Sequence, residues 1–416
     1  MNAGPVLIVG GGIGGLTLAL SLHQVGKACR VFEAAPEIKP LGVGINLLPH
    51  AMRELTELGL QDKLAAVAVE TREFCYYDRF GHFIHKEPRG RFAGYDWPQL
   101  SIHRGDLHAV LIDSVRERLG ADAFALGKKC TGFAQDEEGG TAGGVTVRFE
   151  DGTSAQGAAA IGCDGIHSAI RKQLFPAEGP PSYQGINMWR GVTRGKPYLS
   201  GASMVVAGWL EVGKMVVYPI RNLDDGWQLV NWVAEIQSPR NVRQDWNLAG
   251  KLEDFYPVFA DRAHAWLDIA ALIRDADSIL EYPMVDRDPL PFWTQGRVTL
   301  LGDAAHPMYP RGSNGGGQAI LDARVLAGCL RRETSVEAAL AAYETARLKP
   351  AYEVVIANRS IGPDAILRTV HERTGDKPFD RIDDVVRPGE LQAMAENYKR
   401  IAGFEREALK QRASLV

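Results

Sequence analysis

The chain opens with a short continuous run of apolar residues, Val6 to Val9, which leads directly into glycines. A run of that length predicts a strand buried on both faces. Side chains at helical spacing follow at Leu16, Ala19, Leu20 and His23. Gly26 is a stop signal for that helix, and a second β-like run, "CRVFE", ends at Glu33. The pattern predicts a strand, a helix and a second strand between residues 6 and 33.

Two later apolar runs each end in a turn that pairs glycine with aspartate. The segment "AAAIGCDGIHSAIR" (158–171) predicts a strand, an Asp164–Gly165 turn and a helix capped by Ser168. The segment "RVTLLGDAAH" (297–306) predicts a buried strand followed by Gly302 and Asp303. A glycine-rich loop, "PRGSNGGGQAI" (310–320), then leads into another predicted helix.

Between residues 183 and 285 the pattern changes to short β-branched and aromatic runs separated by turns, which predicts an antiparallel sheet. Residues 72–100 are expected to add strands to it. The glycines of 137–144 predict a hairpin turn, because no helical pattern follows them. From about residue 336 the chain is predicted to be helical, with a break or kink at Pro350.

The composition narrows the class of protein. With 45% hydrophobic and 24% charged residues, the 416-residue chain has the profile of a soluble globular protein. A formal net charge of −4 gives no general attraction to nucleic acid or to acidic membranes. The five cysteines are widely spaced and form no CxxC, which predicts reduced thiols in a cytoplasmic protein. No apolar run approaches the roughly 20 residues needed to span a bilayer, and no histidine pair has the further ligands of a metal site.

The first strand–helix unit has the chemistry of a dinucleotide site. Gly10, Gly12 and Gly15 fit GxGxxG, in which glycines let backbone N–H groups approach a pyrophosphate at a helix N-terminus. Glu33 would accept hydrogen bonds from the adenosine ribose. An ordinary βα turn is the competing interpretation, but strand, helix, second strand and acid all occur at the expected spacing. The motif alone does not distinguish FAD from NAD.

Taken together, the GxGxxG turn, the Asp164–Gly165 turn and the Gly302–Asp303 turn resemble, in order and spacing, the single-component FAD-dependent aromatic monooxygenases of the p-hydroxybenzoate hydroxylase type. The strings "PLGVGIN", "SIHRGDL", "MWRGVT", "YPMVDRDPLP" and "TLLGDAAHPMYP" are most similar to the phenazine-tailoring branch of that family. Arg311 and three consecutive glycines in the loop depart from that branch, which leaves the substrate open.

The resemblance implies an α/β fold with a Rossmann-like FAD-binding domain of the glutathione-reductase type, an antiparallel-sheet substrate domain and C-terminal helices. The FAD-binding domain would be discontinuous, formed by 1–71, 101–182 and 286–335. The substrate domain would comprise 72–100 and 183–285, and the helical segment 336–416.

The resemblance also implies a set of residues that bind FAD without a covalent link. Asp303 would bind a ribityl hydroxyl, and the loop from Pro310 would lay backbone N–H groups against the flavin ring. A turn acid that caps the next helix is the alternative for Asp303, and a surface salt bridge is the alternative for Arg104. The predicted cofactor residues are Gly10, Gly12, Ile13, Gly14, Gly15, Glu33, Ala34, Gly44, Ile45, Arg104, Cys130, Asp164, Gly302, Asp303, Pro310, Gly312, Ser313, Asn314, Gly315 and Gly316.

In the resembled fold the antiparallel sheet roofs the substrate cavity. The candidate lining residues are Met188, Arg190, Tyr218, Trp232 and Pro310, and packing within the sheet core is the competing interpretation for each.

The implied activity is monooxygenation: NAD(P)H, bound transiently, reduces FAD, and O2 forms a flavin hydroperoxide that transfers one oxygen atom to an aromatic or heteroaromatic substrate. Because the flavin is the electrophile, no catalytic side chain is named. Baeyer–Villiger-type or decarboxylative oxygenation, and a non-catalytic flavoprotein that sequesters a small aromatic ligand, remain alternatives. A disulfide reductase is disfavoured, since no redox cysteine pair and no second GxGxxG are found. The expected partners are the small aromatic substrate and, at most, a second copy of the chain, in a monomer or homodimer.

Overall fold

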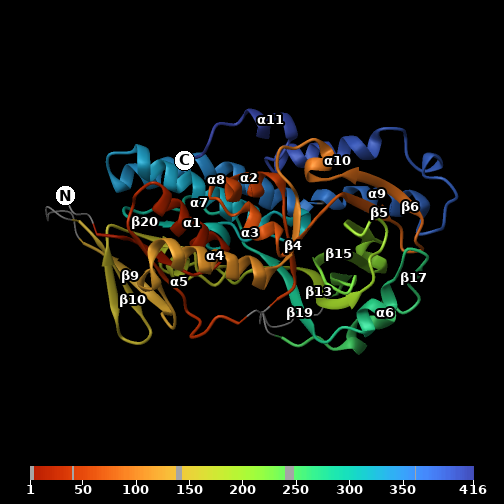
Figure 1. Cartoon of the computed structure of the whole chain (residues 1–416), viewed down its shortest axis with the longest axis horizontal. Coiled ribbons are helices and arrows are strands. Elements are labelled where there is room, and N and C mark those ends of the chain that lie inside the picture. The colour runs from red at the N-terminus through yellow and green to blue at the C-terminus, as the bar shows by residue number, and fades with distance from the viewer. Residues whose placement is uncertain (1–3, 40–41, 137–142, 239–247, 361) are drawn as a thin grey trace.

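In the computed structural model, which describes residues 4–39, 42–136, 143–238, 248–360 and 362–416, two sheets of different kind lie side by side (Figure 1). One is a five-stranded parallel sheet in the order β20-β12-β1-β2-β8. Its strands are β1 (Val6–Val9), β2 (Cys29–Phe32), β8 (Phe124–Ala125), β12 (Ala159–Gly162) and β20 (Val298–Leu300). Helix α1 (Ile13–Gln24) contacts both α4 (Arg104–Leu119) and α7 (Gly315–Arg332). The sheet with these helices is the predicted Rossmann-like unit.

The turn between β1 and α1 is tight because two glycines leave no room for side chains. Gly10 has a φ of 110°, and a Cβ there would lie 2.3 Å from the carbonyl oxygen of Cys163. A Cβ on Gly15 would lie 2.1 Å from the Gly10 carbonyl oxygen. The first helix therefore begins directly beneath the carboxyl ends of the parallel strands, where α/β proteins bind ligands.

Smaller elements surround this sheet. Two three-stranded sheets have the orders β11-β10-β9 and β3-β7-β4. Their strands are β3 (Gly44–Leu47), β4 (Ala68–Glu70), β7 (Leu100–His103), β9 (Cys130–Gln135), β10 (Val145–Phe149) and β11 (Ser154–Gly157). The short helices of this half are α2 (Pro49–Glu57), α3 (Gln61–Ala65) and α5 (Ala169–Leu174). Strands β9 and β10 pair in antiparallel fashion, while the predicted hairpin turn between them falls largely outside the described residues.

The second large sheet has seven strands in the order β19-β13-β16-β15-β14-β5-β6. They are β5 (Glu73–Tyr77), β6 (Phe83–Pro88), β13 (Ser182–Gly195), β14 (Ser203–Ala207), β15 (Lys214–Asn222), β16 (Gln228–Gln237) and β19 (Ile279–Asp286). The antiparallel prediction holds for every pair except β14 and β5, which run parallel.

The two faces of the seven-stranded sheet bury different things. One face, the far face, packs Trp189, Val217 and Trp232 into a core with Phe255 and helix α6 (Ile269–Arg274). The hairpin of β17 (Ala263–His264) and β18 (Leu267–Asp268) lies next to that helix. The other face, the near face, points toward the parallel-sheet half and the C-terminal helices.

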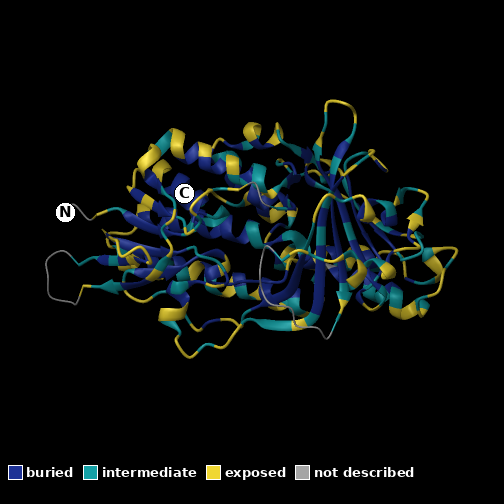
Figure 2. Cartoon of the chain, turned by 90° about the horizontal axis from the view of Figure 1, so that it is seen from below, coloured by how far each residue is buried: buried dark blue, intermediate teal, exposed yellow. Residues whose placement is uncertain are grey.

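The C-terminal helices are α8 (Val336–Ser360), α9 (Ala365–Thr374), α10 (Glu390–Ile401) and α11 (Arg406–Gln411). Helix α8 continues through Pro350, so the break predicted there is absent. Ile366 and Leu391 pack on Tyr76 and Val206 of the near face, which closes the sheet on that side. Buried residues follow the strands and the inward sides of the helices (Figure 2). Within the described residues, no helix has both the length and the apolar character needed to cross a membrane.

Candidate active site

Two adjoining cavities lie between the parallel sheet and the near face. We call the first the glycine-loop cavity, because the turns after β1, β12 and β20 and the loop before α7 line it. The second, the sheet cavity, is lined by the near face and by residues of the C-terminal segment. They share Asn46, Met188, Arg190, Tyr218, Pro310 and Ser313, so these six residues surround the junction between them.

Most of the predicted cofactor residues line the glycine-loop cavity. They are Gly12, Ile13, Gly14, Gly44, Ile45, Arg104, Gly302, Asp303, Pro310, Ser313, Asn314, Gly315 and Gly316. A Cβ on Gly12 would have no atom within 4 Å, so this glycine keeps open a space that a larger side chain would enter. No ion pair involving Arg104 is found among the described residues, and its side chain faces the cavity instead of forming the surface salt bridge considered above.

Two helices begin at this cavity without a side-chain cap. The N-cap of α1 is Gly12, which has no side chain, and the side chain of Asn314, the N-cap of α7, does not bond the first turn of its helix. Their free backbone N–H groups and positive dipole ends therefore face the cavity. Such ends favour a phosphate or another group with negative charge.

Asp303 presents its carboxylate to the same cavity. The accessible surface of Asp303 lines the cavity. No described residue donates a hydrogen bond to its carboxylate. Burial raises the pKa of Asp303 and nearby Asp322 adds to the rise, while His306 and Arg104 oppose it. A carboxylate held in this way has its full capacity to accept hydrogen bonds from a ligand.

Other predicted cofactor residues lie behind the cavity wall. Gly10 and Gly15 shape the first turn, and Glu33 accepts hydrogen bonds from the backbone N–H groups of Gly11 and Ala35, each at 2.8 Å. Asp164 caps α5 through Ala169 at 2.7 Å, although its Oδ1 atom is buried without a partner. Ala34 and Cys130 also lie outside the lining of both cavities, and Gly312 lines the sheet cavity.

The strand alternation explains which sheet residues reach the cavities. Met188 and Arg190 of β13 point to the near face, as does Tyr218 of β15, and all three line both cavities as predicted. Trp232 was predicted beside them, and this prediction is wrong. Its side chain belongs to the far-face core, where its indole nitrogen donates to Thr193 Oγ1 at 3.0 Å. On β16 the odd-numbered neighbours Val233 and Glu235 line the sheet cavity instead.

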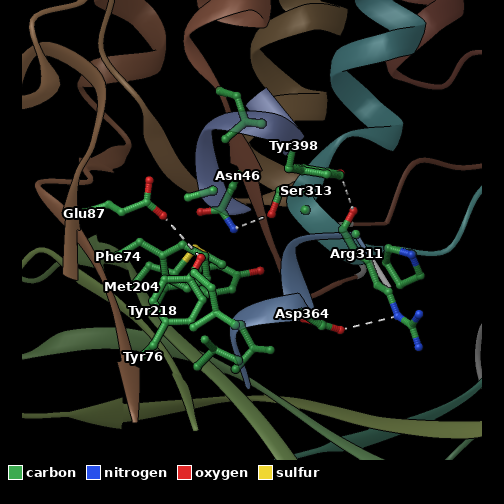
Figure 3. Close-up of a pocket in the computed structure, with 18 of the residues that line it drawn as sticks. Asn46, Phe74, Tyr76, Glu87, Met204, Tyr218, Arg311, Ser313, Asp364 and Tyr398 are labelled. Atoms are coloured by element: carbon green, nitrogen blue, oxygen red, sulfur yellow. Dashed lines mark hydrogen bonds and ion pairs between the residues drawn. The ribbon is translucent and has the colours of Figure 1, made fainter. Parts of the chain in front are cut away.

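Sequence reasoning missed the charged groups of the sheet cavity, which come from distant parts of the chain. Lys214 lies 3.2 Å from Glu235 and 2.7 Å from Asp364. Burial alone would lower the pKa of Lys214, but Asp364 and Glu235 raise it. Figure 3 shows Asp364 also pairing with Arg311, at 3.4 Å. The only signal available in the sequence was the alternation of β15 and β16, which places 214 and 235 on one face.

A second ion cluster stands at the other wall of the sheet cavity. Glu87 lies 2.7 Å from Lys399 and 3.3 Å from Arg89. Burial alone would raise the pKa of Glu87, but Arg89 and Lys399 lower it. Lys399 also lies 2.9 Å from Glu396, so each cluster contains two cationic and two anionic side chains.

Arg190 is the exception among the charged groups that line the sheet cavity. It donates to the carbonyl oxygen of Gly44 at 2.9 Å, its Nε atom is buried without a partner, and no described carboxylate pairs with it. Its positive charge therefore has no counter-ion at the junction. Burial raises the pKa of the neighbouring Tyr218, and Arg190 opposes that rise.

Comparison with known proteins places this geometry in context. A model of the FAD binding domain family matches residues 4–358. The phenazine 1,6-dicarboxylic acid hydroxylase of Lysobacter antibioticus is 44% identical over 85% of this chain and 89% of its own length. A 3-amino-4-hydroxybenzoate 2-monooxygenase of Streptomyces cremeus is 36% identical over 84% of each chain. Among solved structures, the HpxO protein of Klebsiella pneumoniae, complexed with FAD and uric acid, superimposes with a TM-score of 0.75 at 25% identity, over 98% of this chain and 97% of that one.

Proposed function

This chain belongs to the FAD binding domain family, and from that premise we propose where its cofactor and its substrate bind. The protein is an FAD-dependent monooxygenase that consumes NAD(P)H and O2 and acts on an aromatic compound. The family, the α/β fold, the activity and the cofactor predicted from the sequence are confirmed.

We assign FAD to the glycine-loop cavity. Gly12 and the N-terminus of α1 would hold the pyrophosphate, Asp303 would accept a hydrogen bond from a ribityl hydroxyl, and the N-terminus of α7 would stabilise negative charge on the flavin. Support comes from the open space at Gly12, the two uncapped helices and the unpaired carboxylate. The chemistry that bound FAD supplies is redox chemistry, namely its own reduction by NAD(P)H and the activation of O2. Glu33 and Ala34 at the ribose, Cys130 at the adenine and Asp164 remain predictions.

We assign the aromatic substrate to the sheet cavity, with its reacting edge at the junction. Phe74, Met188, Met204 and Tyr218 give this cavity flat apolar walls suited to a planar ring system. The ion clusters keep the C-terminal segment closed over it, which excludes water from the reaction.

The substrate carries an anionic group, and Arg190 binds it. The observation that carries this assignment is that no described carboxylate pairs with Arg190, because a partly buried cation without a counter-ion is stabilised by an anion. A carboxylated heteroaromatic compound, of the kind named for the relative from Lysobacter antibioticus, meets both requirements.

Arg190→Gln tests the assignment. We expect the KM for phenazine-1-carboxylic acid to rise about 10- to 100-fold, since a charge-assisted hydrogen bond is lost. The uncharged phenazine-1-carboxamide should be bound as well as before. Arg194→Gln is the matched control, because Arg194 lies on the same strand but pairs with Asp225 at the surface. Equal losses for the acid and the amide would contradict an anion site at Arg190.

We also propose the domain division stated above, a cytoplasmic location and a monomer or homodimer. The strands of the seven-stranded sheet fall within 72–100 and 183–285, except for Ser182 at the start of β13 and Asp286 at the end of β19. The five cysteines are unpaired, which suits a reducing compartment. Size-exclusion chromatography with light scattering would test the oligomeric state.

A further inference from the structure

Ser313 occupies a strained position at the junction of the two cavities. Its backbone φ is 57°, a conformation that glycine adopts freely and serine does not. Among the described non-glycine residues, only Leu199 and Asp376 also have positive φ, and neither lines the glycine-loop cavity or the sheet cavity. Backbone strain of this kind clusters at functional sites, where the strained residue has a role that offsets its cost.

The Ser313 hydroxyl ends a row of hydrogen bonds that run in one direction. Ser101 Oγ donates to Asn46 Oδ1 at 2.6 Å. Asn46 Nδ2 in turn donates to Ser313 Oγ at 3.4 Å (Figure 3). Since a hydroxyl has a single hydrogen, Ser101 must in turn accept from Thr71, at 2.7 Å. Thr71, Ser101 and Asn46 are between 1% and 3% exposed, so the row is fixed in the interior.

The direction of this row leaves the hydrogen of the Ser313 hydroxyl without an acceptor. Ser313 accepts from Asn46, and no described residue accepts from Ser313. Its O–H is therefore free to donate to a ligand at the junction. Arg190 already offers the charged donor there, whereas the neutral hydroxyl of Ser313 suits a neutral acceptor in the plane of a ring.

We propose that Ser313 is a specificity-determining residue whose hydroxyl donates a hydrogen bond to a ring nitrogen of the substrate. This assignment rests on the proposed function, in which Arg190 holds the anionic group of the same molecule. A carbocyclic ring of the same shape presents C–H in place of the acceptor, which leaves the hydroxyl unpaired and is disfavoured. The site thus selects nitrogen heteroaromatic acids over carbocyclic ones.

The test compares phenazine-1-carboxylic acid with anthracene-1-carboxylic acid, which has the same shape and carboxylate but no ring nitrogen. Binding to the FAD-loaded enzyme is followed by the change in flavin absorbance. Wild type should prefer the phenazine. Ser313→Ala should weaken phenazine binding about tenfold and leave anthracene binding unchanged. Ser313→Gly should lose the same preference while its thermal unfolding temperature stays equal to or above that of wild type, because the strain is relieved.

Asn46→Asp separates the donor role from a merely structural tether. A carboxylate at this position accepts from both Ser101 and Ser313, so the contact is kept while the Ser313 hydrogen is turned away from the cavity. The preference for the phenazine should fall as in Ser313→Ala. The new carboxylate repels the carboxylate of both probes equally, so this repulsion does not affect the preference. Equal binding of both probes by wild type, or equal losses for both in Ser313→Ala, would overturn the inference while leaving the proposed function intact. If wild type binds neither probe, the proposed substrate class fails and this inference with it.

Discussion

At the scale of single residues, Asp322 holds the turn that presents Asp303. Its Oδ2 atom accepts from the Gly302 backbone N–H at 3.0 Å and lies 2.5 Å from His306 Nε2, while Oδ1 pairs with Arg347 at 2.7 Å. Burial alone would raise the pKa of Asp322, but His306 and Arg347 lower it to about 2. The ionised form is therefore part of the folded structure at neutral pH.

We expect Asp322→Asn to lower the free energy of unfolding by about 3–5 kcal/mol at pH 7, because Arg347 is left buried without its counter-ion. The folded pKa lies below the usual value near 3.9, so this stabilisation is present above that value and is lost as the pH falls toward about 2. Urea unfolding of wild type and variant at several pH values checks this. A difference that stays constant down to pH 3 would argue against the charge effect.

Asp303→Asn should affect ligand binding and not folding. We expect FAD affinity to fall by about one to two decades, since the bond to a charged acceptor is lost. Because burial disfavours the carboxylate in the free protein, the apoprotein should melt no lower than wild type. Titration of apoprotein with FAD, followed by flavin fluorescence, measures the first effect and calorimetry the second. Unchanged FAD affinity would mean that the cofactor is placed wrongly.

At the scale of elements, the strands could be recognised from the sequence, but their faces could not. The alternation of "QLVNWVAEI" is visible in the letters, yet choosing the inward face required knowing what covers each side. Phe255 and α6 cover the side of Trp232, and their apolar spacing alone does not reveal their partner. The three glycine turns were predictable because local backbone geometry determines them.

A matched pair of substitutions tests the two faces. Trp232→Phe should lower the free energy of unfolding by about 2 kcal/mol through lost packing and the lost bond to Thr193, with substrate preference unchanged. Met188→Ala should alter the ratio of kcat/KM between small and large aromatic substrates, because it enlarges the junction. Urea unfolding and steady-state kinetics on both variants supply the comparison. A change of preference in Trp232→Phe would contradict the assignment of faces.

At the scale of the whole molecule, the C-terminal helices contact the loop that precedes α7. Tyr398 of α10 accepts from Asn314 Nδ2 at 2.9 Å and donates to Asn358 Oδ1 at 2.8 Å. One hydroxyl therefore joins α8, α10 and the N-cap of α7. Asn358 and Asn314 lie 40 and 84 positions from Tyr398 in the chain, so no local sequence pattern could predict these contacts.

Tyr398→Phe should remove both bonds and lower the free energy of unfolding by about 2 kcal/mol. The loop beside α7 loses a tether, so FAD should also dissociate faster. Stopped-flow release of FAD, with thermal unfolding as the companion measurement, checks both effects. Tyr95→Phe is a suitable control, because Tyr95 also loses one partly buried hydroxyl bond, to the Phe404 carbonyl oxygen, but lines neither cavity. Faster release in both variants would point to general loosening.

The separation of the two faces of the seven-stranded sheet also has an evolutionary consequence. Far-face side chains pack in a core, whereas alternate positions on the same strands line the sheet cavity. Substitutions can therefore accumulate at every second residue of these strands and change the substrate while the protein still folds. Relatives named for phenazine, aminohydroxybenzoate and hydroxynicotinate chemistry are the divergence that such a scaffold permits. Selection for a new compound should leave its record at the near-face positions first.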